Sequence, residues 1–171
     1  RDNIVTAELA LDSGGKFLAF RVDTLANLGA YLGSNTPHSP TNNLGGLAGV
    51  YTTPAIYTAV RAVFSNTGWT APYRGAGRPE ASLAIEKAID AAAREMGIDR
   101  VDIRRRNLIP ADAMPYKTGL IFEYDSGEFE TVLDKALKLA DYDGFEARRA
   151  EARTRGVYRG IGIGFAIEQS A

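Results

Sequence analysis

The sequence predicts an α+β fold in which helices pack against mixed sheets, and three patterns in the chain indicate it. Apolar and polar residues alternate over residues 5–11 and again over 17–22, which is the period of a half-buried strand. A third β-rich run follows at 56–64. Apolar residues at positions 85, 89, 92, 93 and 96 then repeat with the period of a helix.

The first strands and the first long helix have recognisable ends. The turn sequence Asp12-Ser13-Gly14-Gly15 joins the first two strands, so we expect a hairpin over residues 4–27. Residues 28–55 are rich in Gly and Pro and are predicted to be irregular apart from one short helical turn. The long helix has Pro79 in its first turn, where a missing N–H costs little, and Gly97 at its end.

The later part of the chain is predicted to be mainly helical. Asp99 is expected to cap a short helix that runs to Arg106, and residues 122–124 are expected to form a short strand. Ser126 is expected to cap a longer helix, and residues 144–155 have the composition of a charged surface helix. The apolar stripe of the longer helix comprises Phe129, Val132, Leu133, Ala136, Leu137 and Ala140.

These elements divide the chain into four successive parts. Residues 1–64 hold the hairpin, the Gly/Pro-rich segment and the third strand; residues 65–80 form a loop; residues 81–156 are helical; and residues 157–171 are a truncated strand. Because position 1 is Arg and the chain ends directly after an apolar run, we expect it to be an internal piece of a longer protein.

Composition excludes several kinds of site. The 171 residues are 45% hydrophobic and 24% charged, as in a folded globular protein, and the net charge of −1 gives no general attraction to nucleic acid or to anionic lipid. There is no cysteine, so this chain provides no disulfide, iron–sulfur ligand or thiolate nucleophile. A single histidine, His38, argues against a multi-histidine metal site, and no apolar run has the length of a membrane span.

The segment Tyr73-Arg74-Gly75-Ala76-Gly77-Arg78-Pro79-Glu80 is the most informative in the chain. A strand leads into it, two glycines allow close backbone approach, and a helix begins directly after it. Because helix N-termini carry unpaired N–H donors and a partial positive charge, this arrangement suits an anion. The segment matches neither a P-loop nor a dinucleotide fingerprint. A tight strand-to-helix turn whose arginines pair with surface carboxylates explains the same residues.

Residues 73–81, Tyr-Arg-Gly-Ala-Gly-Arg-Pro-Glu-Ala, resemble the active-site loop of molybdenum hydroxylase large subunits. This family includes xanthine dehydrogenase, aldehyde oxidase and aerobic carbon monoxide dehydrogenase. The Tyr-Arg-Gly-Ala-Gly-Arg form is similar to the form II carbon-monoxide-dehydrogenase-like branch. Segments resembling the family on both sides of the loop, in the same order, are 25–31, 50–57, 104–109 and 114–116.

The resemblance implies that this chain is part of the aldehyde oxidase/xanthine dehydrogenase molybdopterin-binding domain. It implies a molybdenum–molybdopterin cofactor in the cytosine dinucleotide form, and oxidation of a small substrate (an aldehyde, an N-heterocycle or CO) with oxygen derived from water. Iron–sulfur and flavin subunits or domains would accept the electrons, and the enzyme would be cytoplasmic. The residues carried over as cofactor-binding are Tyr73, Arg74, Gly75, Ala76, Gly77 and Arg78, with Arg74 also catalytic and none ligating the metal.

Three departures from the family pattern limit these expectations. Gly75 stands where carbon monoxide dehydrogenases carry a copper-binding cysteine, so we expect no copper. Xanthine dehydrogenases have an arginine that orients the purine; the matching position falls near Asn42, so we expect this role to be absent. The family's general-base glutamate lies outside these residues, so the segment alone is expected to be inactive. The alternative function is an anion- or nucleotide-binding module without redox activity.

Four smaller signals have a structural explanation beside a functional one. His38 is interpreted as a solvated or hydrogen-bonded loop histidine, and Arg104-Arg105-Arg106 as a solvated helix face. Gly160, Gly162 and Gly164 fit either plain strand packing or close approach of a backbone or cofactor. Trp69 fits a hydrophobic anchor better than a substrate funnel.

Overall fold

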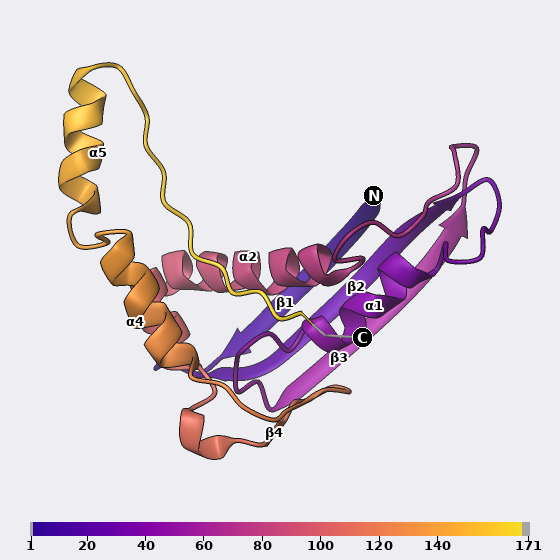
Figure 1. Ribbon diagram of the computed structural model, residues 1–171, viewed down its shortest axis with the longest axis horizontal. Coiled ribbons are helices and arrows are strands. Elements are labelled where there is room, and N and C mark those ends of the chain that lie inside the picture. Colours follow the sequence, from indigo (N-terminus) through magenta and orange to yellow (C-terminus); the bar gives the residue numbers. More distant parts are fainter. Residues whose placement is uncertain (1, 169–171) are drawn as a thin grey trace.

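The computed structural model describes residues 2–168 and shows a three-stranded sheet with helices packed on one face (Figure 1). The strands are β1 (Asn3–Leu11), β2 (Phe17–Gly29) and β3 (Ala55–Phe64), in the order β1-β2-β3. β1 is antiparallel to β2, whereas β3 is parallel to β2, so the sheet is mixed. The predicted α+β class, the hairpin and the third strand are confirmed.

Two polar side chains hold the turn of the hairpin. Asp12 Oδ1 accepts hydrogen bonds from Gly14 N at 2.8 Å and from Lys16 N at 2.9 Å, which explains the turn sequence. From the other side, Asn107 Nδ2 donates to Gly15 O and Asn107 Oδ1 accepts from Phe17 N, both at 2.8 Å. Asn107 is fully buried, and its amide helps to fix the hairpin to the helical part of the chain, together with Arg106 Nη1, which donates to Gly14 O at 2.7 Å.

The Gly/Pro-rich segment is more regular than predicted, because it contains the nine-residue helix α1 (His38–Gly46). Glycines are poor helix formers, but here they allow close packing. A Cβ atom added at Gly45 would lie 2.3 Å from the Phe122 ring, and one at Gly46 would lie 3.3 Å from Ala81 Cβ. Tertiary contacts therefore outweigh the low helix propensity of this segment.

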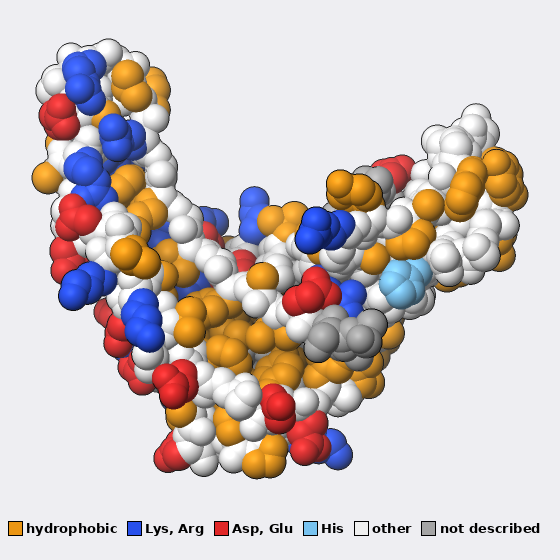
Figure 2. Space-filling view, viewed as in Figure 1, with side chains coloured by type: hydrophobic (Ala, Val, Ile, Leu, Met, Phe, Trp, Pro, Cys, Tyr) orange, Lys and Arg blue, Asp and Glu red, His pale blue; other side chains and the backbone are white. Residues whose placement is uncertain are grey.

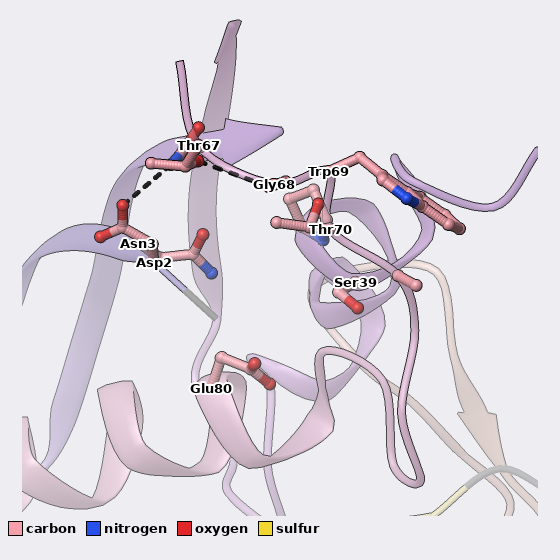
Figure 3. A pocket seen from close by; sticks show the side chains of 11 residues that line it. Asp2, Asn3, Ser39, Thr67, Gly68, Trp69, Thr70 and Glu80 are labelled. Carbon is pink, nitrogen blue, oxygen red and sulfur yellow. Dashed lines mark hydrogen bonds between the residues drawn. The ribbon is translucent and has the colours of Figure 1, made fainter. Parts of the chain in front are cut away.

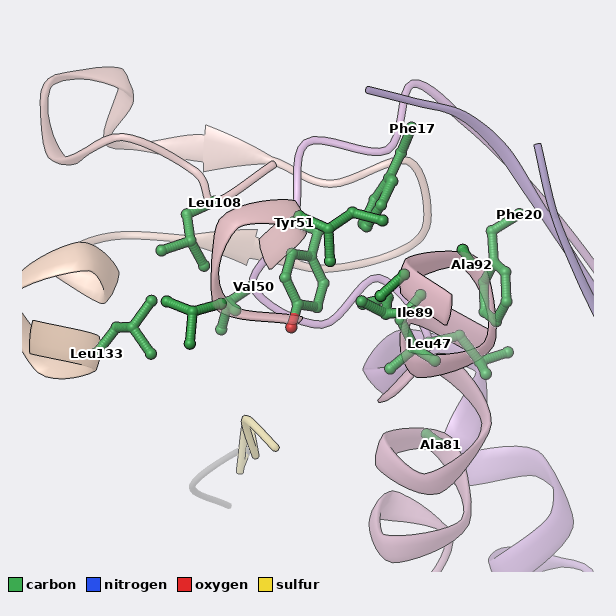
Figure 4. Packing of buried hydrophobic residues seen from close by; sticks show 14 of the residues in the cluster. Phe17, Phe20, Leu47, Val50, Tyr51, Ala81, Ile89, Ala92, Leu108 and Leu133 are labelled. Atoms are coloured by element: carbon green, nitrogen blue, oxygen red, sulfur yellow. The ribbon is translucent and has the colours of Figure 1, made fainter. Parts of the chain in front are cut away.

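Helix α2 (Arg78–Met96) matches its prediction at both ends. Pro79 lies in the first turn, and Gly97 closes the helix in the left-handed conformation with its N–H directed to Ala93 O and Arg94 O. The apolar face of α2 packs on the sheet and on α1 to form the core (Figure 4). The buried residues labelled in that view are Phe17, Phe20, Leu47, Val50, Tyr51, Ala81, Ile89, Ala92, Leu108 and Leu133.

Shorter elements follow α2. Asp99 Oδ1 caps α3 (Arg100–Arg105) by accepting from Val101 N at 2.7 Å and from Asp102 N at 3.2 Å, as predicted. The predicted short strand is β5 (Glu123–Tyr124), which pairs with β4 (Tyr116–Lys117), an element that the sequence did not indicate. A short 3₁₀ helix at Ala111–Ala113 precedes β4.

Helices α4 (Phe129–Leu139) and α5 (Phe145–Thr154) form an arm that projects from the body (Figure 1). The prediction that Ser126 caps α4 is wrong: Ser126 Oγ donates to Asp125 Oδ1, and Glu128 is the N-cap residue. The predicted apolar stripe is also only partly buried. Leu133 is buried, but Val132 is 54% exposed, because α4 leaves the sheet instead of lying along it.

The arm carries the charges predicted for a surface helix. Figure 2 shows Lys and Arg side chains gathered over it. Arg105 joins the arm to α3, since its guanidinium pairs with Glu130 at 2.8 Å and with Asp134 at 2.6 Å.

Residues 157–168, which we call the strap, run extended from α5 back across α2 (yellow in Figure 1). The predicted terminal strand, 157–171, is part of no sheet in its described portion, because no neighbouring strand of the chain lies beside it. Residues 169–171 lie outside the described residues. Ile163, Phe165 and Ile167 of the strap nevertheless pack against the core.

Candidate functional site

The strand register positions the candidate loop. Because β2 and β3 are parallel, their carboxyl ends meet at one edge of the sheet, where Gly29 is opposite Phe64. The segments that leave the two strands therefore start side by side. They are joined by hydrogen bonds from Ala30 N to Thr67 O at 3.0 Å and from Thr70 N to Leu28 O at 3.1 Å.

Residues 73–78 form a tight double turn that leads into α2. Ala76 N donates to Tyr73 O and Arg78 N donates to Gly75 O, both at 2.8 Å. Gly75 and Gly77 have φ values of 83° and 95°, which is the left-handed region that other residues enter only with strain. The two glycines in this segment are therefore required by the turn itself.

The backbone of this turn fits a polar or anionic ligand. Within the described part of the chain, the amides of Gly75 and Gly77 form no hydrogen bond, and Gly77 is the N-cap of the 19-residue helix α2. The helix adds a partial positive charge at the same place. The donor set is therefore suitable for the polar edge or the phosphate groups of a pterin cofactor.

The structure brings the six carried-over residues into one turn, but their side chains diverge. Tyr73 is 77% exposed and Arg74 is exposed. The Arg78 side chain is only 16% exposed and its Nε lies 2.7 Å from Glu168 Oε1 of the strap. Arg78 thus points toward the strap, and the Glu168 carboxylate would compete with the cofactor for its guanidinium.

A cavity of about 410 Å³ lies near the start of α2, where Glu80 lines it but none of residues 73–78 does (Figure 3). The loop at 67–71, the start of α1 and Glu80 of α2 contribute to its walls. Trp69 lines the cavity and also acts as the anchor that the sequence suggested. A Cβ atom at Gly33 would lie 2.4 Å from the indole, and the Tyr31 ring centroid lies 6.2 Å from that of Trp69. The indole therefore holds the segments 30–37 and 65–77 together.

The start of α1 lies next to the same cavity. The Nε2 of His38 lies 2.6 Å from Asn42 Nδ2, so the interpretation as a hydrogen-bonded histidine is confirmed. Its placement in a loop is wrong, because His38 is the first residue of α1. Asn42, near which the family's purine-orienting arginine is expected, has a neutral amide that contacts this imidazole.

The structure corrects the interpretation of Arg104 as part of a solvated helix face. Arg104 is fully buried; its guanidinium contacts Glu86 Oε2 at 2.8 Å and Asp90 Oδ1 at 2.9 Å. Tyr51 Oη donates to Glu86 Oε1 at 2.7 Å, and burial together with Glu86 raises the pKa of Tyr51 above its ordinary range. The signal for this burial was that Arg104 follows Val101 by three residues, which places the two on the same face of α3.

Two kinds of site are not found in the described residues. No group of three His, Asp or Glu side chains within 2–168 is arranged to hold a metal ion. None of the helices in the same range is both long enough and apolar enough to cross a membrane.

Comparison with known proteins relates this geometry to a family. Residues 1–108 match the model of the molybdopterin cofactor-binding domain. The chain is 36% identical over 160 residues to the carbon monoxide dehydrogenase large chain of Hydrogenophaga pseudoflava, covering 90% of this chain and 19% of that protein. It is 30% identical over 175 residues to the 6-hydroxypseudooxynicotine dehydrogenase complex subunit gamma of Paenarthrobacter nicotinovorans, covering 99% and 22%.

Solved structures show the same relationship. Quinoline 2-oxidoreductase from Pseudomonas putida 86 superposes with a TM-score of 0.82 at 30% identity, covering 91% of this chain and 20% of that one. CO dehydrogenase from Oligotropha carboxidovorans gives 0.80 at 33% identity with the same coverage. The chain thus spans about a fifth of the length of the relatives it matches. By its sequence and its fold, the chain belongs to the molybdopterin cofactor-binding domain family.

Proposed function

We propose that this chain forms one wall of the molybdopterin site in the large subunit of a molybdenum hydroxylase. The observation that carries the proposal is the turn at 73–78, where the N–H groups of Gly75 and Gly77 at the start of α2 have no hydrogen-bond acceptor among the described residues. Family membership supports the identity of that ligand.

Each part of the turn has a distinct task in this proposal. The amides of Gly75 and Gly77 would donate to polar atoms of the cofactor, and the exposed Arg74 would add a charge-assisted hydrogen bond near the reacting centre. Tyr73 and Ala76 would line the cofactor, and Arg78 would fix the turn through Glu168. When bound, the cofactor supplies the molybdenum centre at which oxygen from water is transferred to the substrate.

We further propose an aldehyde or an N-heterocycle as the substrate. The relatives' names support a heterocycle, since they include a nicotine 6-hydroxylase, a nicotinate dehydrogenase and a quinoline 2-oxidoreductase. Gly75 offers no thiolate, so this turn does not hold copper, and we do not expect CO to be the substrate. The cytosine dinucleotide form, iron–sulfur and flavin partners, and a cytoplasmic location complete the proposal.

The test compares two arginines in the complete large subunit. Removing Arg74 removes a charge-assisted hydrogen bond of about 1.5–3 kcal/mol, so Arg74→Ala should weaken cofactor retention on the order of 10- to 100-fold. Arg153→Ala is the matched control, because Arg153 is exposed on α5 and has no contact with the turn. Molybdenum would be measured by mass spectrometry and the pterin by fluorescence.

Two results would contradict the proposal. Equal molybdenum and pterin contents in the two variants would remove the special role of the turn. A nucleotide bound by the wild-type protein without molybdenum would favour an anion-binding module without redox activity.

A further inference from the structure

The strap has two faces that differ in burial. Ile161, Ile163, Phe165 and Ile167 are partly buried and alternate with exposed residues, of which three are glycines. A Cβ atom added at Gly160 or Gly162 would meet no other atom within 4 Å. The strap is therefore an extended segment with its apolar side on the core and an open outer side.

One edge of the strap is bonded by side chains of α2 and α3. Arg100 Nη1 donates to Ile161 O at 2.8 Å, and Arg104 Nη2 donates to Ile163 O at 3.2 Å. On the same edge, Phe165 N donates to Glu86 Oε1 at 3.2 Å. In an extended chain, the N–H and C=O of one residue point to one side, and those of the next residue point to the other. All three bonded residues are odd-numbered, as this geometry requires.

The other edge, made by the even-numbered residues, is open. In the part of the chain that the structure describes, the backbone N–H and C=O groups of Gly160, Gly162 and Gly164 form no hydrogen bond. Exposed strand edges in folded proteins are usually protected by charged residues or proline, and residues 160–167 contain neither. The edge therefore has the geometry and the composition of a strand that receives a partner.

We propose that the even-numbered edge of the strap pairs with an extended β-strand supplied by the part of the large subunit that lies outside this chain. The matched relatives carry about four fifths of their length outside the region they share with this chain, which makes such a strand available. Main-chain hydrogen bonds provide the affinity in this mode of recognition, so an edge formed mainly by glycines is well suited to it. The inference rests on family membership and does not depend on the cofactor turn.

Hydrogen exchange in the complete large subunit tests the pairing. Measured residue by residue, the amides of Gly162 and Gly164 should exchange on the order of 100-fold more slowly than in an unstructured chain. Exchange at the unstructured rate at both glycines, with Phe165 still protected, would overturn the proposal. Protection that appears only as the subunit concentration is raised would identify a second copy as the partner and would overturn the assigned occupant.

A pair of substitutions at one position adds a control. Gly162→Pro removes the N–H from the open edge, whereas Gly162→Ala keeps it and places a methyl group in open space. We expect protection at Gly164 to fall at least about 10-fold with proline and to persist with alanine. Equal protection of Gly164 in both variants would contradict edge pairing. Cofactor content measured on the same samples separates this outcome from a failure of the cofactor site.

Discussion

Replacing Arg104 with methionine is the sharpest test of the core. The arginine is fully buried and its guanidinium lies within 3 Å of Glu86 and Asp90, so Arg104→Met leaves two carboxylates without their counter-charge. The variant also removes the donors to Arg100 O and Ile163 O. Methionine is long enough to fill most of the space, so the effect reports on charge and hydrogen bonds more than on volume.

The size of the effect follows from burial. Removing one member of a buried ion pair costs about 3–5 kcal/mol, because the remaining charge stays desolvated. Arg105→Met is a matched control one residue away: its ion pairs with Glu130 and Asp134 are solvent-exposed, and such pairs contribute about 0–1 kcal/mol. A domain of this length loses about 2–4 °C of Tm per kcal/mol, so the two variants should differ by roughly 5–20 °C.

Thermal unfolding followed by circular dichroism measures both variants. The double variant Arg104→Met/Glu86→Gln should recover part of the loss, because it removes one of the uncompensated charges. Equal destabilisation by Arg104→Met and Arg105→Met would refute the assignment of Arg104 as a buried, paired cation.

Three further outcomes are expected. Asn107→Ala leaves the buried N–H of Phe17 without its acceptor, so urea unfolding should show a loss of about 2–4 kcal/mol, and a loss below 1 kcal/mol would contradict the role of Asn107. Gly33→Ala should displace the indole of Trp69 and shift its fluorescence. An unchanged emission spectrum would contradict the tight packing of Gly33 against the indole. Burial raises the pKa of Tyr124 to about 12, so the stability linked to its neutral form is complete below pH 10 and is lost as the pH rises toward 12. The free energy of unfolding of Tyr124→Phe should therefore depend less on pH across this range. Identical pH profiles for the variant and the wild type would argue against the raised pKa.

The elements that the sequence predicted well are those with local signals at their ends. Helix α2 combines a 3.6-residue apolar period with Pro79 and Gly97 at its two ends, and the hairpin combines alternation with an Asp-initiated turn. Helix α1 was underestimated because its glycines are selected by contacts with Phe122 and Ala81, which are distant in the sequence.

The errors have a common physical origin in burial. Arg104 was assigned to solvent from the charge of its neighbours, although its position on the helix places it on the apolar face. Val132 was assigned to an apolar stripe, although α4 leaves the body of the protein. At the candidate site, the backbone turn could be predicted from its glycines, but the direction of Arg78 could not, because its partner Glu168 lies at the far end of the chain.

Because β2 and β3 are parallel, the sheet fixes the position of the cavity rim but does not fix which side chains form it. The two segments that build the rim start together because Gly29 and Phe64 are in register, and this proximity is a property of the sheet. Side chains on either segment can consequently be exchanged without relocating the opening. The lining of the cavity can thus vary while the sheet that positions it stays constant.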